Sequence, residues 1–170
     1  MIKMFTHKDL IPIAYSWVLK RASCGVAFKE MVTLSSECPD VLGIQGGTNT
    51  VLVEVKVGRG DFLSDKKKPF RIRPEKGMGT YRFYMCPVGL IKPDELPNNW
   101  GLIYVDATGK ACCVVNPYCK TTTGNIWSGG FISKNIVAEY GMMYSALRRL
   151  HKMGHIEYIY DKQHIYNHKE

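Results

Sequence analysis

Two carboxylates and one lysine are spaced in this sequence so that a single hairpin would bring them together. Glu54 and Lys56 lie two residues apart in a valine-rich run, and Asp40 directly precedes the β-rich run before it. A charged group in an apolar strand costs free energy unless it is ion-paired, bound to a metal or open to water. Two carboxylates beside an amine form a site for a hard divalent cation. Such a cation can activate a water molecule and neutralise a phosphate, so these residue types indicate phosphodiester chemistry.

The elements that must position this group are two short strands and the turn between them. Val41–Ile44 and Thr50–Val57 are rich in β-forming residues, and Gln45–Asn49 between them holds a Gly-Gly turn signal. Because side chains alternate along a strand, Glu54 and Lys56 should point to one face and the neighbouring valines to the other. The turn then brings the aspartate at the start of the first strand alongside the charged end of the second.

The order Pro39-Asp40 followed by Glu54-Val55-Lys56 resembles the PD-(D/E)XK nuclease superfamily. Phe28-Lys29-Glu30 precedes this motif and Asp61–Lys67 follows it, an order similar to the MmcB-like DNA-repair branch and related small bacteriophage proteins. The resemblance covers roughly residues 25 to 87. It implies an α/β fold with a restriction-endonuclease-like core, in which a central mixed β-sheet is flanked by helices. A C-terminal strand pair and helix would extend this core.

The resemblance also implies a role for each matched residue. Asp40 and Glu54 would bind Mg²⁺ or Mn²⁺, with the Val55 carbonyl as a further ligand. Lys56 would position the attacking water or stabilise the charge of the phosphorane as it forms. Glu30 is a candidate third acid, with a strand-end carboxylate or an ion-pair partner as the alternative. The function expected on this basis is a metal-dependent nuclease, acting on DNA in repair or in phage and host nucleic-acid processing.

A basic run follows the hairpin and suggests where nucleic acid would bind. Arg59-Gly60-Asp61 opens a short helix that Pro69 should end, and residues 71 to 79 then read as a mobile loop. Its cations would clamp a phosphate backbone, although such a run is also typical of a solvated surface. Asp61 and Asp65 would support the site or lie on a solvated helix. The proposed nucleic-acid-binding residues are Lys66, Lys67, Lys68, Arg71, Arg73 and Lys76.

The rest of the chain predicts a single domain over residues 1–170, with a core at about 9–115 and an extension at about 116–170. Asp9 is the expected N-cap of the first helix and Ser133 that of the last. Glu37 is a second candidate helper acid, or a loop residue. Trp127 and Tyr118 could stack on bases or pack as lid or core residues. The other expected elements are helices at 9–22 and 133–153, strands at 25–34, 81–85, 101–105 and 111–115, and a helical turn at 93–96.

Charge and cysteine content limit which partners and which cellular compartment are expected. The 170 residues carry a formal net charge of +8, which suits a polyanionic partner. The six cysteines lack C-x-x-C spacing, and the N-terminus lacks a signal-peptide pattern, which predicts buried thiols and a cytoplasmic protein. No run is apolar enough to cross a membrane. A homodimer is compatible with the sequence, which does not fix the oligomeric state.

Two other functional classes are left open by the residues. One is a nuclease-fold module that binds DNA or a protein without cutting, although clustered acids are not needed to hold a polyanion. The other is a structural zinc site made of cysteines and of histidines spaced four apart on a helix. Within the nuclease hypothesis, the sequence does not distinguish DNA from RNA or endonuclease from exonuclease. The residues that would make up the zinc site are Cys112, Cys113, Cys119, His151, His155, His164 and His168.

Overall fold

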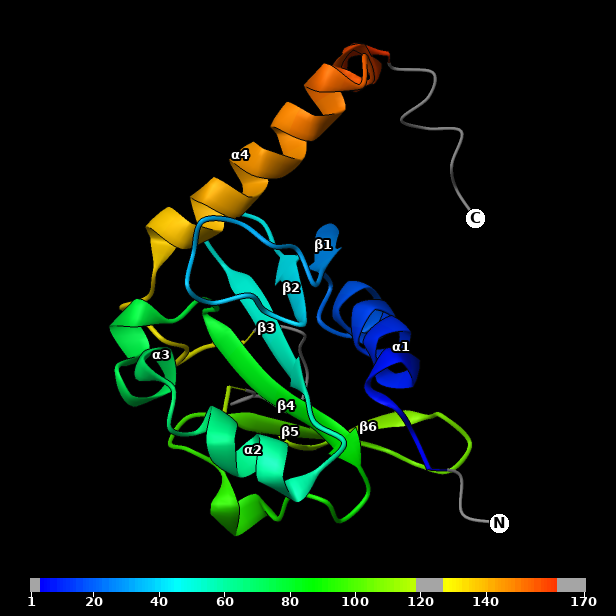
Figure 1. Ribbon diagram of the computed structural model, residues 1–170, viewed down its shortest axis with the longest axis vertical. Coiled ribbons are helices and arrows are strands. Elements are labelled where there is room, and N and C mark those ends of the chain that lie inside the picture. Colours follow the sequence, from blue (N-terminus) through cyan, green and yellow to red (C-terminus); the bar gives the residue numbers. More distant parts are fainter. Residues whose placement is uncertain (1–3, 119–126, 162–170) are drawn as a thin grey trace.

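A six-stranded mixed sheet forms the centre of the protein, and its strands lie side by side in sequence order (Figure 1). The computed structural model describes residues 4–118 and 127–161. The first three strands are antiparallel, the third to the fifth are parallel, and the sixth is antiparallel to the fifth. This confirms the expected α/β class, with a central mixed sheet and a C-terminal strand pair. The strands are β1 (Val26–Lys29), β2 (Val41–Ile44), β3 (Thr50–Val55), β4 (Tyr81–Pro87), β5 (Gly101–Val105) and β6 (Ala111–Val115).

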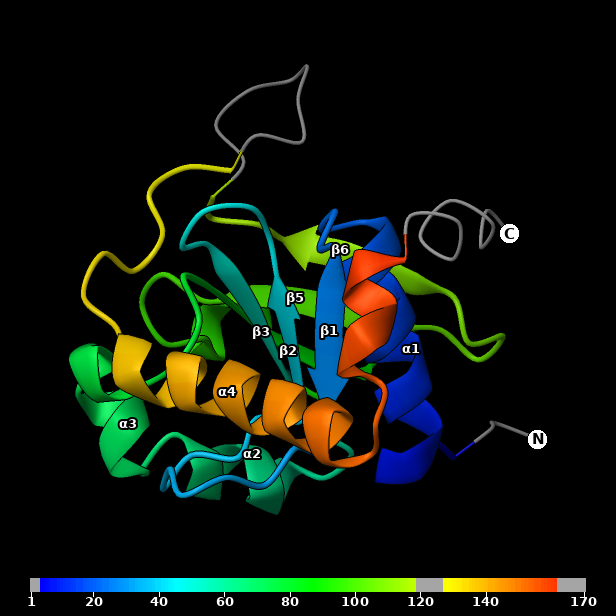
Figure 2. The same cartoon turned by 90° about the horizontal axis from the view of Figure 1, so that it is seen from above.

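Helices cover both faces of the sheet. Helix α1 packs against one face, while α2 and α3 lie on the other side (Figure 1). Helix α4 runs across the direction of the first three strands (Figure 2), and its C-terminal half extends away from the sheet. Within the described residues no helix is long and apolar enough to cross a membrane. The helices are α1 (His7–Lys20), α2 (Arg59–Asp65), α3 (Pro69–Ile72) and α4 (Ile136–Lys152), with short 3-10 turns η1 (Pro74–Lys76), η2 (Pro93–Glu95) and η3 (Ile156–Tyr160).

Strand β3 divides the core in two because its side chains alternate between the faces. Val51, Val53 and Val55 pack with α1 in one apolar cluster, and Leu52 packs with α2 in the other. Glu54 follows Leu52 on this second face and is buried there. The hairpin predicted from the sequence is confirmed by the antiparallel pairing of β2 with β3.

Helix α1 begins two residues earlier than expected. Thr6, and not Asp9, is the N-cap, because the Thr6 side chain accepts from the Asp9 N–H and the Asp9 carboxylate accepts from the Thr6 N–H. This reciprocal arrangement is a capping box, which satisfies N–H groups that have no partner inside the helix. Its consequence for the site is that His7 becomes the first helical residue, on the side of α1 that carries the buried Leu10 and Ala14.

Strand β1 is shorter than the strand predicted over residues 25–34. It ends at Lys29, and Glu30 adopts a left-handed backbone conformation with φ of 44°. This region is uncommon for residues other than glycine, asparagine and aspartate. The alternation of side chains is therefore broken at Glu30, which lies exposed instead of sharing a buried strand face with Phe28 and Val32.

The segment expected to be a mobile basic loop is mostly structured. Pro69 opens α3 instead of only ending α2, and η1 follows directly. Arg71 lies inside the molecule, while Arg73 and Lys76 are exposed. Gly77 and Gly79 are buried beside Arg82, whose guanidinium donates to carbonyl oxygens of both.

The C-terminal third completes the core and leaves one helix partly uncovered. Tyr118 is fully buried and Trp127 packs against the α1 side of the core, which supports the packing interpretation of these two aromatic residues. The N-cap of α4 is Asn135 and not Ser133, since the Asn135 side chain accepts from the Ala138 N–H. Several large apolar side chains of α4 are exposed: Ile136, Val137, Tyr140, Tyr144, Leu147 and Leu150.

Candidate functional site

Three acids stand in one row across the ends of β1, β2 and β3. The Glu30 N–H donates to the Asp40 carbonyl at 2.9 Å, one step beyond the pair of Lys29 with Val41. On the other side Val41 pairs with Val53, so the next step of the same register places Asp40 opposite Glu54. The convergence predicted from the hairpin is therefore built into the strand register.

Asp40 is the central residue of this row and is held on both of its oxygens. Its Oδ2 accepts from the Val55 N–H at 2.8 Å, and its Oδ1 lies 3.1 Å from Nε2 of His7. Only 17% of its side chain is exposed. Burial, and then the negative charge of Glu54, raise the pKa of Asp40 from 3.8 to about 6, against the opposing charge of Lys56.

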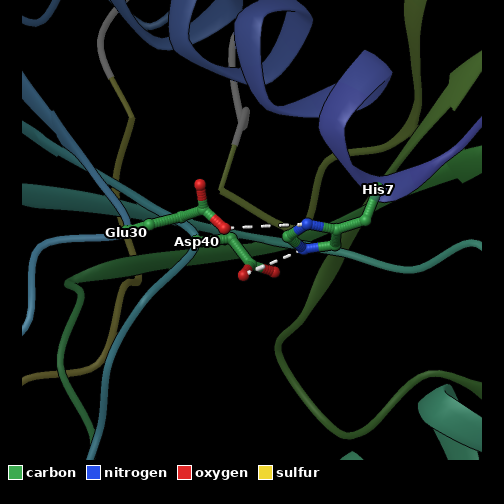
Figure 3. A group of neighbouring side chains, drawn as sticks. All are labelled: His7, Glu30 and Asp40. Carbon is green, nitrogen blue, oxygen red and sulfur yellow. Dashed lines mark hydrogen bonds and ion pairs between the residues drawn. The ribbon is translucent and has the colours of Figure 1, made fainter.

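His7 is a member of the site that the sequence analysis missed. Its Nδ1 lies 3.7 Å from Oε1 of Glu30, while its other ring nitrogen faces Asp40 (Figure 3). The ligand atoms of these three residues all lie within 4.8 Å of one another. A signal was present in the sequence, because a capping box that starts at Thr6 sets His7 three residues before Leu10, on the buried side of the helix.

Glu30 occupies this site from a more exposed position than the sequence suggested. About half of its side chain, 56%, is open to solvent. Its backbone is left-handed, and its carboxylate points toward His7 (Figure 3). A strained non-glycine residue of this kind persists where the surrounding structure holds it, and such residues cluster at functional sites.

Glu54 and Lys56 form a buried ion pair beside Asp40. Nζ of Lys56 lies 3.1 Å from Oε2 of Glu54, 3.6 Å from Asp65 and 4.0 Å from Asp61. Burial would lower the pKa of Lys56, yet Glu54 and the other acids outweigh this and raise it. Lys56 therefore stays protonated through the neutral range. The Val55 backbone contributes its N–H to Asp40, as described above.

Arg71 does not serve as an exposed phosphate clamp, in contrast to the sequence-based prediction. Its guanidinium contacts three carboxylates inside the molecule: it donates to Glu37, lies 2.9 Å from Oε1 of Glu54 and donates to Oδ2 of Asp65 at 2.9 Å. Its side chain is 1% exposed and lies over the Trp100 ring, 5.0 Å from the centroid. Its donors are therefore directed at carboxylates inside the molecule and not at the surface.

Glu37 and Asp65 are structural partners of Arg71. The sequence suggested that Glu37 is a helper acid or loop residue, but it is buried and also accepts from the Met78 N–H. Asp65 is buried too, accepts from the Tyr84 hydroxyl at 2.8 Å and pairs with Lys68 at 2.8 Å. Although burial would raise the pKa of Asp65, Arg71 and Lys56 hold it below its ordinary value.

The remaining predicted residues lie on the surface around this buried network. Asp61 is half exposed, and Lys66 donates to the Glu95 carbonyl at 2.8 Å. Lys67, Arg73 and Lys76 are exposed. Of these side chains, Asp61 lies next to the site, 4.0 Å from Nζ of Lys56.

The zinc alternative gains no support from the described residues. Their single cluster of three or more potential metal ligands is the His7 group, which contains no cysteine. His151 and His155 are exposed, Cys112 is exposed and Cys113 is partly buried. Cys119, His164 and His168 lie outside the described residues.

The raised pKa of Asp40 predicts how stability depends on pH without divalent cations. The folded protein retains a proton that the unfolded chain releases between pH 3.8 and about 6. Stability should therefore fall as the pH rises through this window, by at most about 3 kcal/mol. Asp40→Asn should remove this decrease, so its melting temperature should exceed that of the wild type at pH 8 but not at pH 4. Asp94→Asn, at an exposed carboxylate, is the control. If Asp40→Asn kept the pH dependence of the wild type, the raised pKa of Asp40 would be contradicted.

Comparison with known proteins supports the fold without assigning a function. No protein-family model matches this chain, and no curated protein matches it. A solved structure of the SPO1766 protein of unknown function from Silicibacter pomeroyi is similar, with a TM-score of 0.54 and 22% sequence identity. The match covers 83% of this chain and 88% of that chain. At this identity the similarity shows the fold alone.

Proposed function

We propose that this protein is a metal-dependent nuclease that hydrolyses phosphodiester bonds, with DNA as the expected substrate. The observation that carries the proposal is the convergence of His7, Glu30 and Asp40 beside the buried Glu54–Lys56 pair. Asp40, Glu54 and Lys56 are the charged residues of the motif that resembles the PD-(D/E)XK superfamily. The positive net charge of +8 is consistent with a polyanionic substrate.

The donor set fits a divalent cation. Asp40 and Glu30 offer carboxylate oxygens and His7 offers an imidazole nitrogen, all within one ion's reach of one another. Oxygen ligands suit Mg²⁺ and Mn²⁺, and a nitrogen ligand favours a transition metal, so Mn²⁺ should bind more tightly than Mg²⁺. A bound cation would polarise a phosphate oxygen and lower the pKa of a water molecule.

Lys56 supplies the fixed positive charge of the proposed mechanism. It is held by Glu54 and Asp65 and remains protonated, so it would stabilise negative charge on the phosphorane and would not accept a proton. The Val55 N–H fixes Oδ2 of Asp40, and His7 and Glu30 would complete the ligand set around the cation.

Metal titration is the first test. Calorimetry should detect one Mn²⁺ site, and saturation at about 100 times its Kd should stabilise the fold by about 2.7 kcal/mol. His7→Ala and Asp40→Ala should each weaken Mn²⁺ binding by at least about tenfold. His151→Ala, at an exposed histidine of α4, is the matched control and should bind normally. Wild-type protein without Mn²⁺ or Mg²⁺ binding would exclude this site.

Cleavage assays test the reaction itself. Labelled single-stranded, duplex and branched DNA and RNA would be incubated with Mg²⁺ and Mn²⁺, and cutting should depend on Asp40 as well as on metal. Cleavage that persists in Asp40→Ala would point to a contaminating nuclease.

A second candidate function is a nuclease-fold module that binds nucleic acid or protein without cutting. One observation favours it: Lys56 and Arg71 already engage both oxygens of Glu54, which leaves this carboxylate less available to a metal. Tight binding of DNA with no cleavage under any metal would select this alternative.

A further inference from the structure

A groove opens directly beside Glu30, between α1, the end of β1 and the C-terminal half of α4. Its volume is about 430 Å³. Glu30 belongs both to this groove and to the group that could hold a metal ion. A molecule lying in the groove would therefore have one end at the candidate catalytic site. The groove is lined by Tyr15, Ala27, Phe28, Lys29, Glu30, Met31, Val32 and Arg149.

Two cations from distant parts of the chain line this groove. Lys29 is exposed at the end of β1, and its Nζ lies 4.8 Å from the centroid of the Tyr15 ring. Arg149 reaches in from α4, where its guanidinium donates to the Val32 carbonyl at 3.4 Å. Helix α4 thus brings a second positive charge to the groove, although Arg149 and Lys29 are far apart in the sequence. Two cations in one groove fit a chain of phosphates that leads to the acids.

The groove also offers aromatic and apolar surface between these cations. Tyr15 and Phe28 are partly exposed and Val32 is exposed, while Met31 is buried. Base faces stack on such rings without regard to sequence, and cationic grooves with aromatic residues are typical of sites for single strands. A volume of about 430 Å³ lies in the range of ligand sites, about 300–1,000 Å³. This suits an unstacked nucleotide and not a duplex, whose bases stack on each other.

We propose that this groove binds an unpaired nucleic-acid strand and leads it to the site at Asp40. This inference rests on the proposed function, because it specifies the form of nucleic acid that would reach the proposed nuclease site. The groove takes the place of the segment from Lys66 to Lys76 as the proposed binding surface for nucleic acid, because Arg71 of that segment is buried. Lys29 and Arg149 would hold phosphates, and Tyr15 would stack on a base.

Paired charge reversals test the groove against net charge alone. The double variant Lys29→Glu/Arg149→Glu changes the groove, and Lys20→Glu/Lys110→Glu is its control. The control residues line a groove of comparable volume, about 370 Å³, that has no acidic residue among its lining and lies between α1 and β6. Both double variants lower the net charge of +8 by the same amount.

Binding would be measured by fluorescence anisotropy with short single-stranded DNA, single-stranded RNA and blunt duplex DNA, all with divalent cations chelated. The wild type should bind the single strands more tightly than the duplex. Lys29→Glu/Arg149→Glu should raise the Kd for single strands by about tenfold or more at moderate salt. It should also reduce the slope of log K against log salt by about 1.4, since each phosphate contact contributes about 0.7. The control should change the Kd by less than about threefold.

The outcomes distinguish failure of the groove proposal from failure of the nuclease proposal. An equal loss in both double variants, no loss in the groove variant, or a preference for duplex would overturn the groove. Because binding is measured without metal, wild-type protein that binds strands through Lys29 and Arg149 but never cuts would refute the nuclease and leave the groove standing. Metal-dependent cutting by a groove variant with unchanged binding would refute the groove and leave the nuclease. Dependence on the two cations with either DNA or RNA supports the groove, and its absence with both overturns it.

Discussion

Replacing Arg71 with methionine is expected to destabilise the fold by about 3–5 kcal/mol, because it leaves buried carboxylates without their central partner. Glu37, Glu54 and Asp65 face the guanidinium on three sides, and Lys56 and Lys68 are the other cations paired with this group of acids. Methionine keeps the apolar stem and removes the charge. A loss of this size is a large part of the total stability of a domain, about 5–15 kcal/mol. Thermal and urea unfolding would measure it.

Two further variants make the Arg71 experiment decisive. Arg73→Met, at the same residue type two positions along the chain but exposed, should change stability by no more than about 0.5 kcal/mol. Adding Glu37→Gln to Arg71→Met should restore part of the loss, since one unpaired acid is removed. If Arg71→Met does not fold, Arg71→Lys provides the measurement: one ammonium cannot reach three carboxylates as the planar guanidinium does, so an intermediate stability is expected. Equal melting of wild type, Arg71→Lys and Arg71→Met would contradict the network.

The hairpin and its charged face could be predicted because they depend on a local period. Alternation of side chains places Glu54 and Lys56 opposite the valines of β3, and the turn fixes the register with β2. Asp40 then follows from the register without any knowledge of the remaining chain. The same local reasoning located β5, β6 and most of α1 and α4.

The rest of the site could not be predicted because it depends on contacts between distant segments. A run of cations with few acids reads as a solvated surface, whereas the burial of Arg71 requires Glu37, which lies 34 residues earlier. His7 depends on a helix boundary, and an error of two residues hid it. Glu30 depends on a backbone turn at one residue, which interrupts a pattern that otherwise predicts a continuing strand.

Replacing Lys56 with methionine is expected to reduce the rate of single-turnover cleavage by about 10²–10³-fold, the effect of losing one preorganised charge at a developing anion. Affinity for nucleic acid should change little, because Lys56 is only 4% exposed and its partners are acids of the protein. Since its pKa is raised, Lys56 should add no limb to the pH–rate profile near neutrality. Lys56→Arg should rescue poorly, because a planar guanidinium does not fit where a compact ammonium is enclosed.

A structural role for Lys56 must be separated from this catalytic one. Because Lys56 is buried beside Glu54 and Asp65, Lys56→Met should also lose some stability. Cleavage would therefore be measured well below the melting temperature and per molecule of bound substrate, with Lys110→Met at an exposed lysine as the matched control. A purely structural lysine would lower the bound fraction and leave the rate of the bound complex unchanged. A catalytic lysine would lower that rate while binding persists, and unchanged cleavage in Lys56→Met would remove it from the mechanism.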